Sequence, residues 1–274
     1  MLFSSMFKIS STSSIMVSNS IPSSIVFVHG LMGHREDTWT HKNGLFWPAL
    51  LAKDINTARI MTFGYDASVV KLKGMVGDNN IRNHGKNLAT DVSDQRRDCR
   101  NRPIIFIAHS LGGLVCEQAL LYCIEKGKLL EKVFWATRGI IFMGTPHAGA
   151  DLAALAHSLA SYFNIMRRTN VALLDSLRQD SDELTAAQQR FQTLLLKPEV
   201  NIEIYCFFEE QAVTAIGTIV PERSAVLSQY GNQSIAANHM DMTKFSNVND
   251  GGYQKVLNRV KDIIEVIGPS DICT

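Results

Sequence analysis

A serine that could act as a nucleophile stands at position 110. The apolar run Ile104–Ala108 leads into it, and a segment with helical periodicity from Leu114 to Lys126 follows it. This order predicts a strand, a sharp turn and a helix, with Ser110 at the apex of the turn. Ala108 and Gly112 are small because the turn brings the strand end against the start of the helix. The pattern therefore predicts an exposed, strained serine suited to nucleophilic attack.

A serine hydroxyl is a weak nucleophile, so it needs a general base and a group that orients that base. On a sheet that carries such a turn, the three groups follow the chain order serine, acid, histidine. His239 fits this order because it lies in a loop between the last strand-like segment and an amphipathic closing helix. The other seven histidines precede the serine or follow it too early: His29, His34, His41, His84, His109, His147 and His157.

The orienting acid is expected at the end of the apolar strand Ile202–Phe208. Glu209 is the first residue beyond this strand, and Glu210 points to the opposite side because strand side chains alternate. We expect the Glu209 carboxylate within hydrogen-bond distance of His239, at about 2.6–3.2 Å. Glu210, Glu222 and Asp241 remain as alternative acids.

Backbone amides that could stabilise an oxyanion come from two segments. Gly30 lets the chain turn after the first core strand, which aims the amide of Leu31 toward the serine. The amide of Leu111 lies at the predicted helix N-terminus, so the two amides form a predicted oxyanion hole. Five further residues are expected to line the substrate site: His29, Gly30, His109, Thr145 and His147.

The elements that must position these groups alternate between strands and helices. Apolar strands are predicted at 24–29, 58–64, 104–108, 139–144 and 201–208, with helices at 46–55, 79–97, 114–126 and 252–267. This alternation predicts a doubly wound, mainly parallel α/β sheet with its chemistry at the carboxyl ends of the strands. A helical stretch at about 151–197 interrupts the alternation and is predicted to be a cap or lid.

The composition indicates a globular protein that needs neither nucleic acid nor metal. Hydrophobic residues make up 46% of the chain, charged residues 19%, and the net charge is +1. No basic stripe and no apolar run of membrane-spanning length is present. The five scattered cysteines lack metal-ligand spacing, which favours reduced thiols in an intracellular protein. Residues 1–23 are serine-rich and predicted to be a disordered leader, 24–268 one domain, and 269–274 a tail.

Several segments resemble a known family. They include Phe27–His34, Ala58–Asp66, Arg102–Gly113, Thr137–His147, Ile219–Ala225 and Asn238–Phe245. These segments are similar to fungal lipase-like serine esterase domains, and the resemblance covers about residues 24–267. Such domains resemble the serine active site-containing protein of lipid remodelling, and in fungi they also stand at the N-terminus of nucleotide-binding immune-receptor-like proteins. The resemblance implies an α/β-hydrolase fold with Ser110, Glu209 and His239 as a triad.

The leading functional hypothesis is an ester hydrolase that acts on a lipid or another acyl ester through an acyl-enzyme. No cofactor or metal is implied. We expect a cytoplasmic protein, with peripheral association with mitochondrial or endoplasmic reticulum membranes as the alternative. Two other functions remain open: an acyltransferase, in which an alcohol replaces water, and a signalling or partner-binding module with little turnover.

Overall fold

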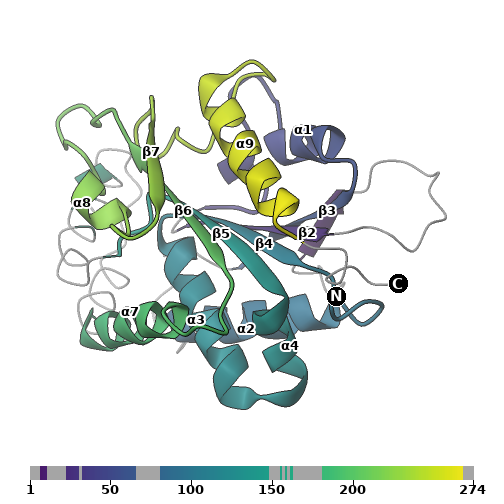
Figure 1. The fold of residues 1–274 in the computed structure, drawn as a ribbon. Coiled ribbons are helices and arrows are strands. Elements are labelled where there is room, and N and C mark those ends of the chain that lie inside the picture. Colours follow the sequence, from purple (N-terminus) through teal and green to yellow (C-terminus); the bar gives the residue numbers. More distant parts are fainter. Residues whose placement is uncertain are drawn as a thin grey trace, which may run out of the picture.

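The computed structural model describes residues 7–10, 23–30, 33–65, 81–147, 155, 158, 161–162 and 181–267. A seven-stranded sheet with the order β1-β3-β2-β4-β5-β6-β7 forms its centre (Figure 1). All neighbouring strands are parallel except β1, which is antiparallel to β3. The strands are β1 (Phe7–Ser10), β2 (Ser23–Val28), β3 (Ala58–Phe63), β4 (Ile104–His109), β5 (Thr137–Met143), β6 (Glu203–Glu209) and β7 (Gly231–Ile235).

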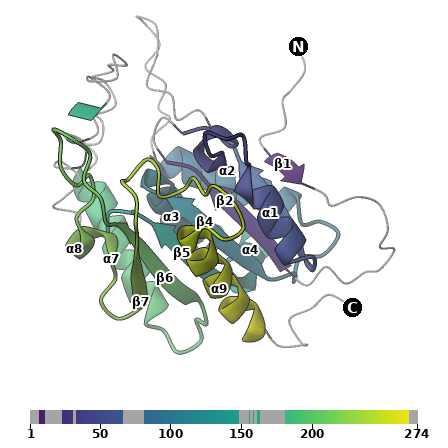
Figure 2. The ribbon, with the colours of Figure 1, turned by 90° about the horizontal axis from the view of Figure 1, so that it is seen from above.

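Helices cover both faces of the sheet, as Figures 1 and 2 show. One layer holds α1 (Trp47–Asp54) and α9 (Gly251–Glu265); the other holds α2 (Ile81–Asp94), α3 (Leu111–Lys126), α4 (Lys128–Ala136) and α7 (Ser181–Leu195). The short helices η1 (Asp37–Trp39) and α8 (Glu222–Ala225) lie in connections. The predicted doubly wound α/β architecture is therefore confirmed.

The central strands are apolar along their whole length because both faces of the sheet are buried. In β2, Val26 and Val28 belong to the core on the side of α2 and α3, whereas Ile25 and Phe27 belong to the core under α1 and α9. Such continuous apolar runs are typical of parallel strands with helices on both sides.

Strand β1 differs from the expectation of a disordered leader. Phe7–Ser10 pairs with β3, with Phe7 opposite Phe63. The pairing satisfies backbone groups that the outer edge of β3 would otherwise expose. The other residues of the predicted leader, apart from Ser23, lie outside the described residues, as does the predicted tail at 269–274.

Only part of the predicted helical cap can be located. Helix α7 packs against α3, and Ala187, Phe191, Leu194 and Leu195 belong to the core on that side. Helix α7 thus belongs to the layer of helices that also holds α2, α3 and α4. Of residues 148–180, the structure describes Leu155, Ser158, Ser161 and Tyr162, so the rest of the predicted cap lies outside the described residues.

The cysteines differ in part from the expectation of reduced thiols. Cys116, Cys123 and Cys206 are free and buried, but Cys99 is disulfide-bonded. Spacing along the chain does not reveal which thiols meet in the folded protein, so this bond could not be predicted from the sequence.

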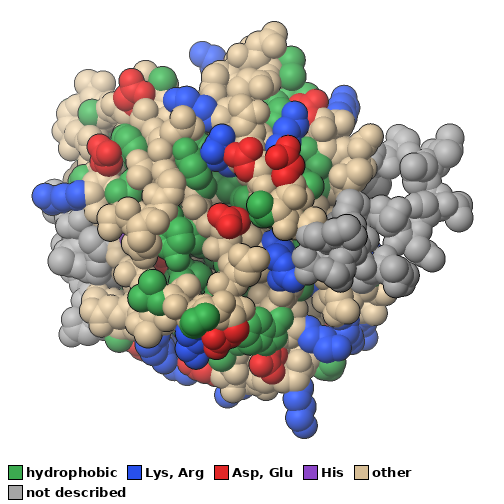
Figure 3. Space-filling model, in the orientation of Figure 1, with side chains coloured by type: hydrophobic (Ala, Val, Ile, Leu, Met, Phe, Trp, Pro, Cys, Tyr) green, Lys and Arg blue, Asp and Glu red, His purple; other side chains and the backbone are tan. Residues whose placement is uncertain are grey.

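The surface mixes charges of both signs. On the face drawn in Figure 3, blue Lys and Arg side chains stand next to red Asp and Glu side chains, with hydrophobic atoms between them. Within the described ranges, no helix is both long enough and apolar enough to cross a membrane.

Close packing between the start of α3 and the end of β2 generates a stability prediction. A Cβ atom at Gly112 would lie 2.4 Å from the carbonyl oxygen of His29 and 2.5 Å from that of Val28. Because both atoms are backbone, Gly112→Ala should lower the free energy of unfolding by about 1–3 kcal/mol, measured by urea denaturation. Gly251→Ala is the control, since nothing lies within 4 Å of a Cβ there. An unchanged urea midpoint for Gly112→Ala would contradict this packing.

Candidate active site

Ser110 occupies a strained turn between β4 and α3. Its backbone angles are φ 52° and ψ −129°, and positive φ is uncommon for a residue other than glycine. The Ser110 amide donates to the Met143 carbonyl at the end of β5, at 2.9 Å. Strand, turn and helix thus follow one another as the sequence predicts, and the turn is anchored to the neighbouring strand.

The loop after β2 reaches the serine through Gly30. A Cβ atom at this position would lie 2.7 Å from Ser110 Cβ and 2.9 Å from the His109 carbonyl oxygen. Glycine is required here by this close approach. Leu111 is the first residue of α3, so its amide has no acceptor within the helix. Leu31, the other predicted oxyanion donor, lies outside the described residues.

His239 stands against the serine hydroxyl. Its Nε2 atom lies 2.9 Å from Ser110 Oγ, and the side chain is fully buried. Gly144, with φ 62°, leaves room for the ring, since a Cβ there would lie 3.0 Å from His239 Nδ1. Burial, followed by the nearby His109, lowers the pKa of His239 well below its usual value. The imidazole is therefore neutral near pH 7 and able to accept a proton.

Glu209 lies close to His239, but farther away than expected. Its Oε1 atom is 3.9 Å from His239 Nδ1, and both side chains are fully buried. This distance exceeds that of the expected hydrogen bond, and Oε1 accepts from the Val220 amide at 2.6 Å. Glu209 Oε2 and His239 Nδ1 have no hydrogen-bond partner. Burial raises the pKa of Glu209, although the backbone amides of Val220, His239 and Ile219 oppose this rise.

The three alternative acids are exposed and have other surroundings. Glu210 accepts a hydrogen bond from Ser234 Oγ at 3.1 Å. Asp241 accepts one from Asn238 Nδ2 at 2.9 Å. Glu222 stands in the first turn of α8. Glu209 is thus the buried member of the four candidates.

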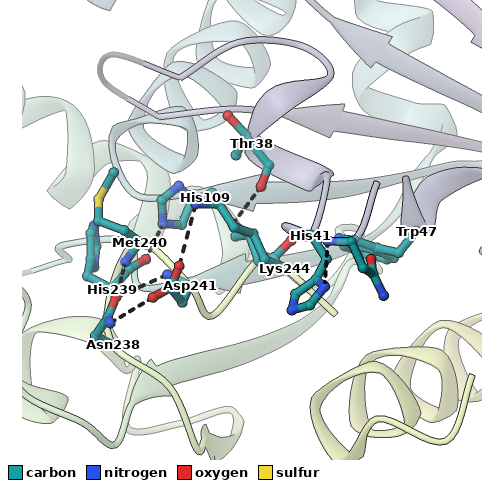
Figure 4. A network of polar contacts seen from close by, with 11 residues as sticks. Thr38, His41, Trp47, His109, Asn238, His239, Met240, Asp241 and Lys244 are labelled. Atoms are coloured by element: carbon teal, nitrogen blue, oxygen red, sulfur yellow. Dashed lines mark hydrogen bonds and ion pairs between the residues drawn. The ribbon is translucent and has the colours of Figure 1, made fainter. Parts of the chain in front are cut away.

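A hydrogen-bond network holds the loop that carries His239 (Figure 4). His109 Nε2 donates to the His239 carbonyl at 2.9 Å, so the residue before the serine positions the backbone of the histidine. Asn238 Oδ1 accepts from the amides of Met240 and Asp241, at 3.0 and 3.1 Å. Burial lowers the pKa of His109 to about 4, which keeps its ring neutral.

Further along the same loop, Thr243 connects it to the α1 side of the sheet. Thr243 Oγ1 donates to the Thr38 carbonyl at 2.8 Å, and the indole of Trp47 donates to the Thr243 carbonyl at 2.7 Å. Hydrogen bonds therefore connect the loop both to the serine turn and to the helical layer that holds α1.

His29 uses both ring nitrogens within the protein. Its Nδ1 donates to the Gly30 carbonyl at 2.9 Å, and its Nε2 accepts from the Tyr65 amide at 3.4 Å. The ring stacks on Tyr65 with centroids 4.3 Å apart, and the Tyr65 hydroxyl donates to the His29 carbonyl at 2.7 Å. Burial lowers the pKa of His29 to about 4. These contacts shape the loop after β2.

Thr145 and His147 face α3. Thr145 is fully buried, and a Cβ at Gly113 would lie 2.2 Å from its Oγ1. His147 Nδ1 lies 3.2 Å from Glu117 Oε1, and its Nε2 lies 4.0 Å from Cys206 Sγ. Burial alone would lower the pKa of His147, but the contacts with Cys206 and Glu117 outweigh it and raise the pKa to about 9.

Four residues near this site were not predicted from the sequence. Gly144 and Tyr65 follow the carboxyl ends of β5 and β3, which is the signal that could have found them. Glu117 is an acid within an otherwise apolar stretch of α3, and such an acid predicts a buried partner. The Val220 amide gives no sequence signal. Among the residues described, no group of three His, Cys, Asp or Glu side chains could hold a metal ion.

The buried pair of Glu117 and His147 generates a pH-dependent stability prediction. Because folding raises the pKa of His147 from 6.5 to about 9, the pair stabilises fully below pH 6.5 and less as the pH rises through about 9. Glu117→Gln should cost about 3–5 kcal/mol at neutral pH, measured by urea denaturation, and should flatten the loss of stability between these two pH values.

Glu125→Gln is the matched control on the same helix. Glu125 is exposed and lies 3.4 Å from Arg190. Its replacement should change the stability by no more than about 0.5 kcal/mol. Equal effects of the two substitutions would contradict a buried charged pair at Glu117.

Known proteins are similar to this chain in sequence, and solved structures are similar to it in fold. The chain is 27% identical over 274 residues to protein SERAC1 of Homo sapiens, covering 90% of this chain and 40% of the relative. SERAC1 of Mus musculus is 28% identical over 264 residues, covering 88% and 39%. The chain thus spans about two-fifths of the length of these relatives.

Among solved structures, α/β hydrolase domain-containing protein 10 from mouse has a TM-score of 0.52 and 14% identity, covering 94% of this chain and 93% of that one. An esterase of Pyrococcus furiosus has a TM-score of 0.52 and 16% identity, covering 90% and 83%. At such low identity the likeness establishes the fold, which is that of the α/β-hydrolases.

The family match covers the segment that carries the serine turn. It spans residues 23–196, more than half of the chain, and so includes Ser110 but ends before Glu209 and His239. With the α/β-hydrolase fold, this match indicates a hydrolase. The chain belongs to the family described as Putative serine esterase (DUF676).

Proposed function

We propose that the protein is a serine ester hydrolase that works through an acyl-enzyme. The observation that carries this proposal is the 2.9 Å contact between Ser110 Oγ, on its strained turn, and Nε2 of a buried histidine. The lowered pKa of His239 keeps Nε2 free to take the serine proton. This is the combination that converts a serine hydroxyl into a nucleophile.

The proposed reaction has two halves. Ser110 Oγ attacks the carbonyl carbon of the ester while its proton passes to His239 Nε2. The resulting oxyanion is held by the Leu111 amide, with the Leu31 amide as the second proposed donor. When the carbon–oxygen ester bond breaks, the imidazolium returns the proton to the departing alcohol. Water then attacks the acyl-enzyme with His239 as base, which releases the acid and restores Ser110.

Glu209 is the proposed partner of the imidazolium. A carboxylate 3.9 Å from Nδ1, with both side chains buried, is at ion-pair distance in a medium where charges act strongly. The carboxylate attracts the ring more strongly when His239 has taken the proton than when the ring is neutral. The hydrogen bond from the Val220 amide holds the carboxylate in one position in both protonation states of His239.

Five residues expected to line the substrate site receive positioning roles instead. His29 and Gly30 shape the loop after β2, and His109 holds the backbone of His239. Thr145 and His147 pack against α3, next to the serine turn. The contacts of these residues within the protein support the proposed positioning roles.

An apolar cluster beside the serine supports an acyl ester as substrate. Leu111 and Leu114, the first turn of α3, pack with Leu155, Ile219 and Val220. These side chains are buried and begin directly after Ser110 in the chain. Apolar surroundings next to a nucleophile favour a substrate with a hydrocarbon chain, and we therefore propose a lipid or other acyl ester.

Replacing the serine tests the proposal. Ser110→Ala should abolish hydrolysis of a short p-nitrophenyl ester and labelling by a fluorophosphonate, because both need the activated hydroxyl. The variant should unfold at the same temperature as the wild type, since the change removes one atom. Near-normal hydrolysis by a folded Ser110→Ala protein would refute the assignment. Analysis of the products with added alcohols separates hydrolysis from acyl transfer.

Neighbouring glutamates allow a matched test of the acid. Glu209→Gln should lower kcat by roughly 10²- to 10⁴-fold, because the amide keeps the shape but loses the charge that stabilises the imidazolium. Glu210→Gln should leave kcat unchanged, since Glu210 is exposed and bound to Ser234. If Glu210→Gln is the more damaging change, the acid has been misassigned while the serine mechanism stands.

A further inference from the structure

Unpaired donors gather at the end of the sheet opposite Ser110. Ser24 in β2 pairs in register with Arg59 in β3, so their side chains leave the same face of the sheet. Ser24 is fully buried and its Oγ has no hydrogen-bond partner. The Nε atom of Arg59 is buried and likewise lacks a partner. Two residues with unpaired donors are therefore register neighbours at the start of adjacent strands.

Arg96 brings a third donor to this place. Its side chain is 1% exposed, Nη2 donates to the Arg100 carbonyl at 2.7 Å, and Nη1 has no partner. Arg59 Nη2 donates to the carbonyl of Gln95, the residue before Arg96, at 2.9 Å. This bond places Arg59 next to the stretch of chain after α2 that carries Arg96.

The positive charges at this place outnumber the negative ones. Burial, then the charges of Arg102 and Arg59, lower the pKa of Arg96 to about 9. Within the described part of the chain, Asp98 is the one acid whose charge acts on Arg59 and Arg96, and it lies 3.0 Å from Arg102. Burying a guanidinium without a matching anion is unfavourable. The cluster is therefore suited to an additional negative group.

We propose that Ser24, Arg59 and Arg96 form a binding site for a phosphate-type oxyanion. The unpaired atoms are a hydroxyl and two guanidinium N–H groups, all of which can donate, so the matching ligand is an acceptor. A tetrahedral oxyanion accepts from several directions, and guanidinium groups recognise it through fixed N–H pairs. Arg59 is half-buried and Asp98 is 60% exposed, so the edge of the cluster reaches solvent.

This site is separate from the serine centre. Ser24, Arg59 and the neighbouring Ile104 stand at the amino ends of parallel strands, whereas Ser110 follows the carboxyl end of β4. The six residues of β4 span about 20 Å at ~3.3 Å per residue. An anion bound there would not compete with an ester at Ser110. Inorganic phosphate and the phosphate headgroup of a lipid share the chemistry that the site recognises.

Thermal unfolding of the full chain with inorganic phosphate tests the proposal, with sodium chloride at equal ionic strength as the reference. Phosphate should raise the Tm of the wild type by roughly 2–4 °C at several times the Kd. Arg96→Gln and Arg59→Gln should lose this shift. Arg97→Gln should keep it, since Arg97 is exposed and pairs with Asp94 at 2.7 Å. If Arg96→Gln does not fold, the half-buried Arg59 decides the outcome.

Co-sedimentation with vesicles separates the two sources of phosphate. Binding to phosphatidylcholine vesicles that contain phosphatidic acid, lost in Arg59→Gln and kept in Arg97→Gln, would assign the site to a lipid headgroup. A phosphate-dependent Tm shift without vesicle binding would assign it to a free anion. The proposal is overturned if neither response occurs, or if Arg59→Gln and Arg96→Gln respond as the wild type does. Ester hydrolysis should be unchanged in all three variants.

Discussion

The backbone turn at Ser110 is the constraint on which the surrounding structure depends. A serine held at φ 52° can persist only where its neighbours leave one conformation open. Gly30 and Gly112 allow the loop after β2 and the start of α3 to approach within backbone contact. The bond from the Ser110 amide to the Met143 carbonyl fixes the turn from the other side. Three adjacent strands thus hold one residue in a strained position.

Burial gives the histidines around this turn different charge states. Desolvation keeps His29 and His109 neutral, with pKa values of about 4, so their rings act as fixed hydrogen-bonding groups. His147 is equally buried, yet its contacts with Cys206 and Glu117 raise its pKa to about 9. His239 is neutral, and Glu209, 3.9 Å from its Nδ1 atom, is the proposed partner of its charged form. Histidine side chains around this turn therefore serve as hydrogen-bonding groups, as an ion-pair partner and as the proposed base.

The sequence predicted the parts of this structure that depend on local patterns. The continuous apolar strands β2 and β4 and the small residues around Ser110 led to the correct layers and to the serine turn. Contacts between distant segments had no such signal. Pairing of β1 with β3, the bond from Val220 to Glu209 and the disulfide at Cys99 all depend on how loops close in three dimensions.

Both ends of the sheet keep some buried polar atoms unpaired, among them Glu209 Oε2 and His239 Nδ1 at the carboxyl ends, but the surroundings of these atoms differ. At the carboxyl ends, His29, His109 and the loop around Asn238 bond to backbone groups, so the proposed machinery is rigid before a substrate arrives. Rigidity of this kind lowers the cost of stabilising a transition state, because few groups must reorient during the reaction. At the amino ends, Ser24 and Arg96 keep unpaired donors although both are buried. Since buried donors seldom stay unpaired, an anion that enters from solvent is the partner that would complete them.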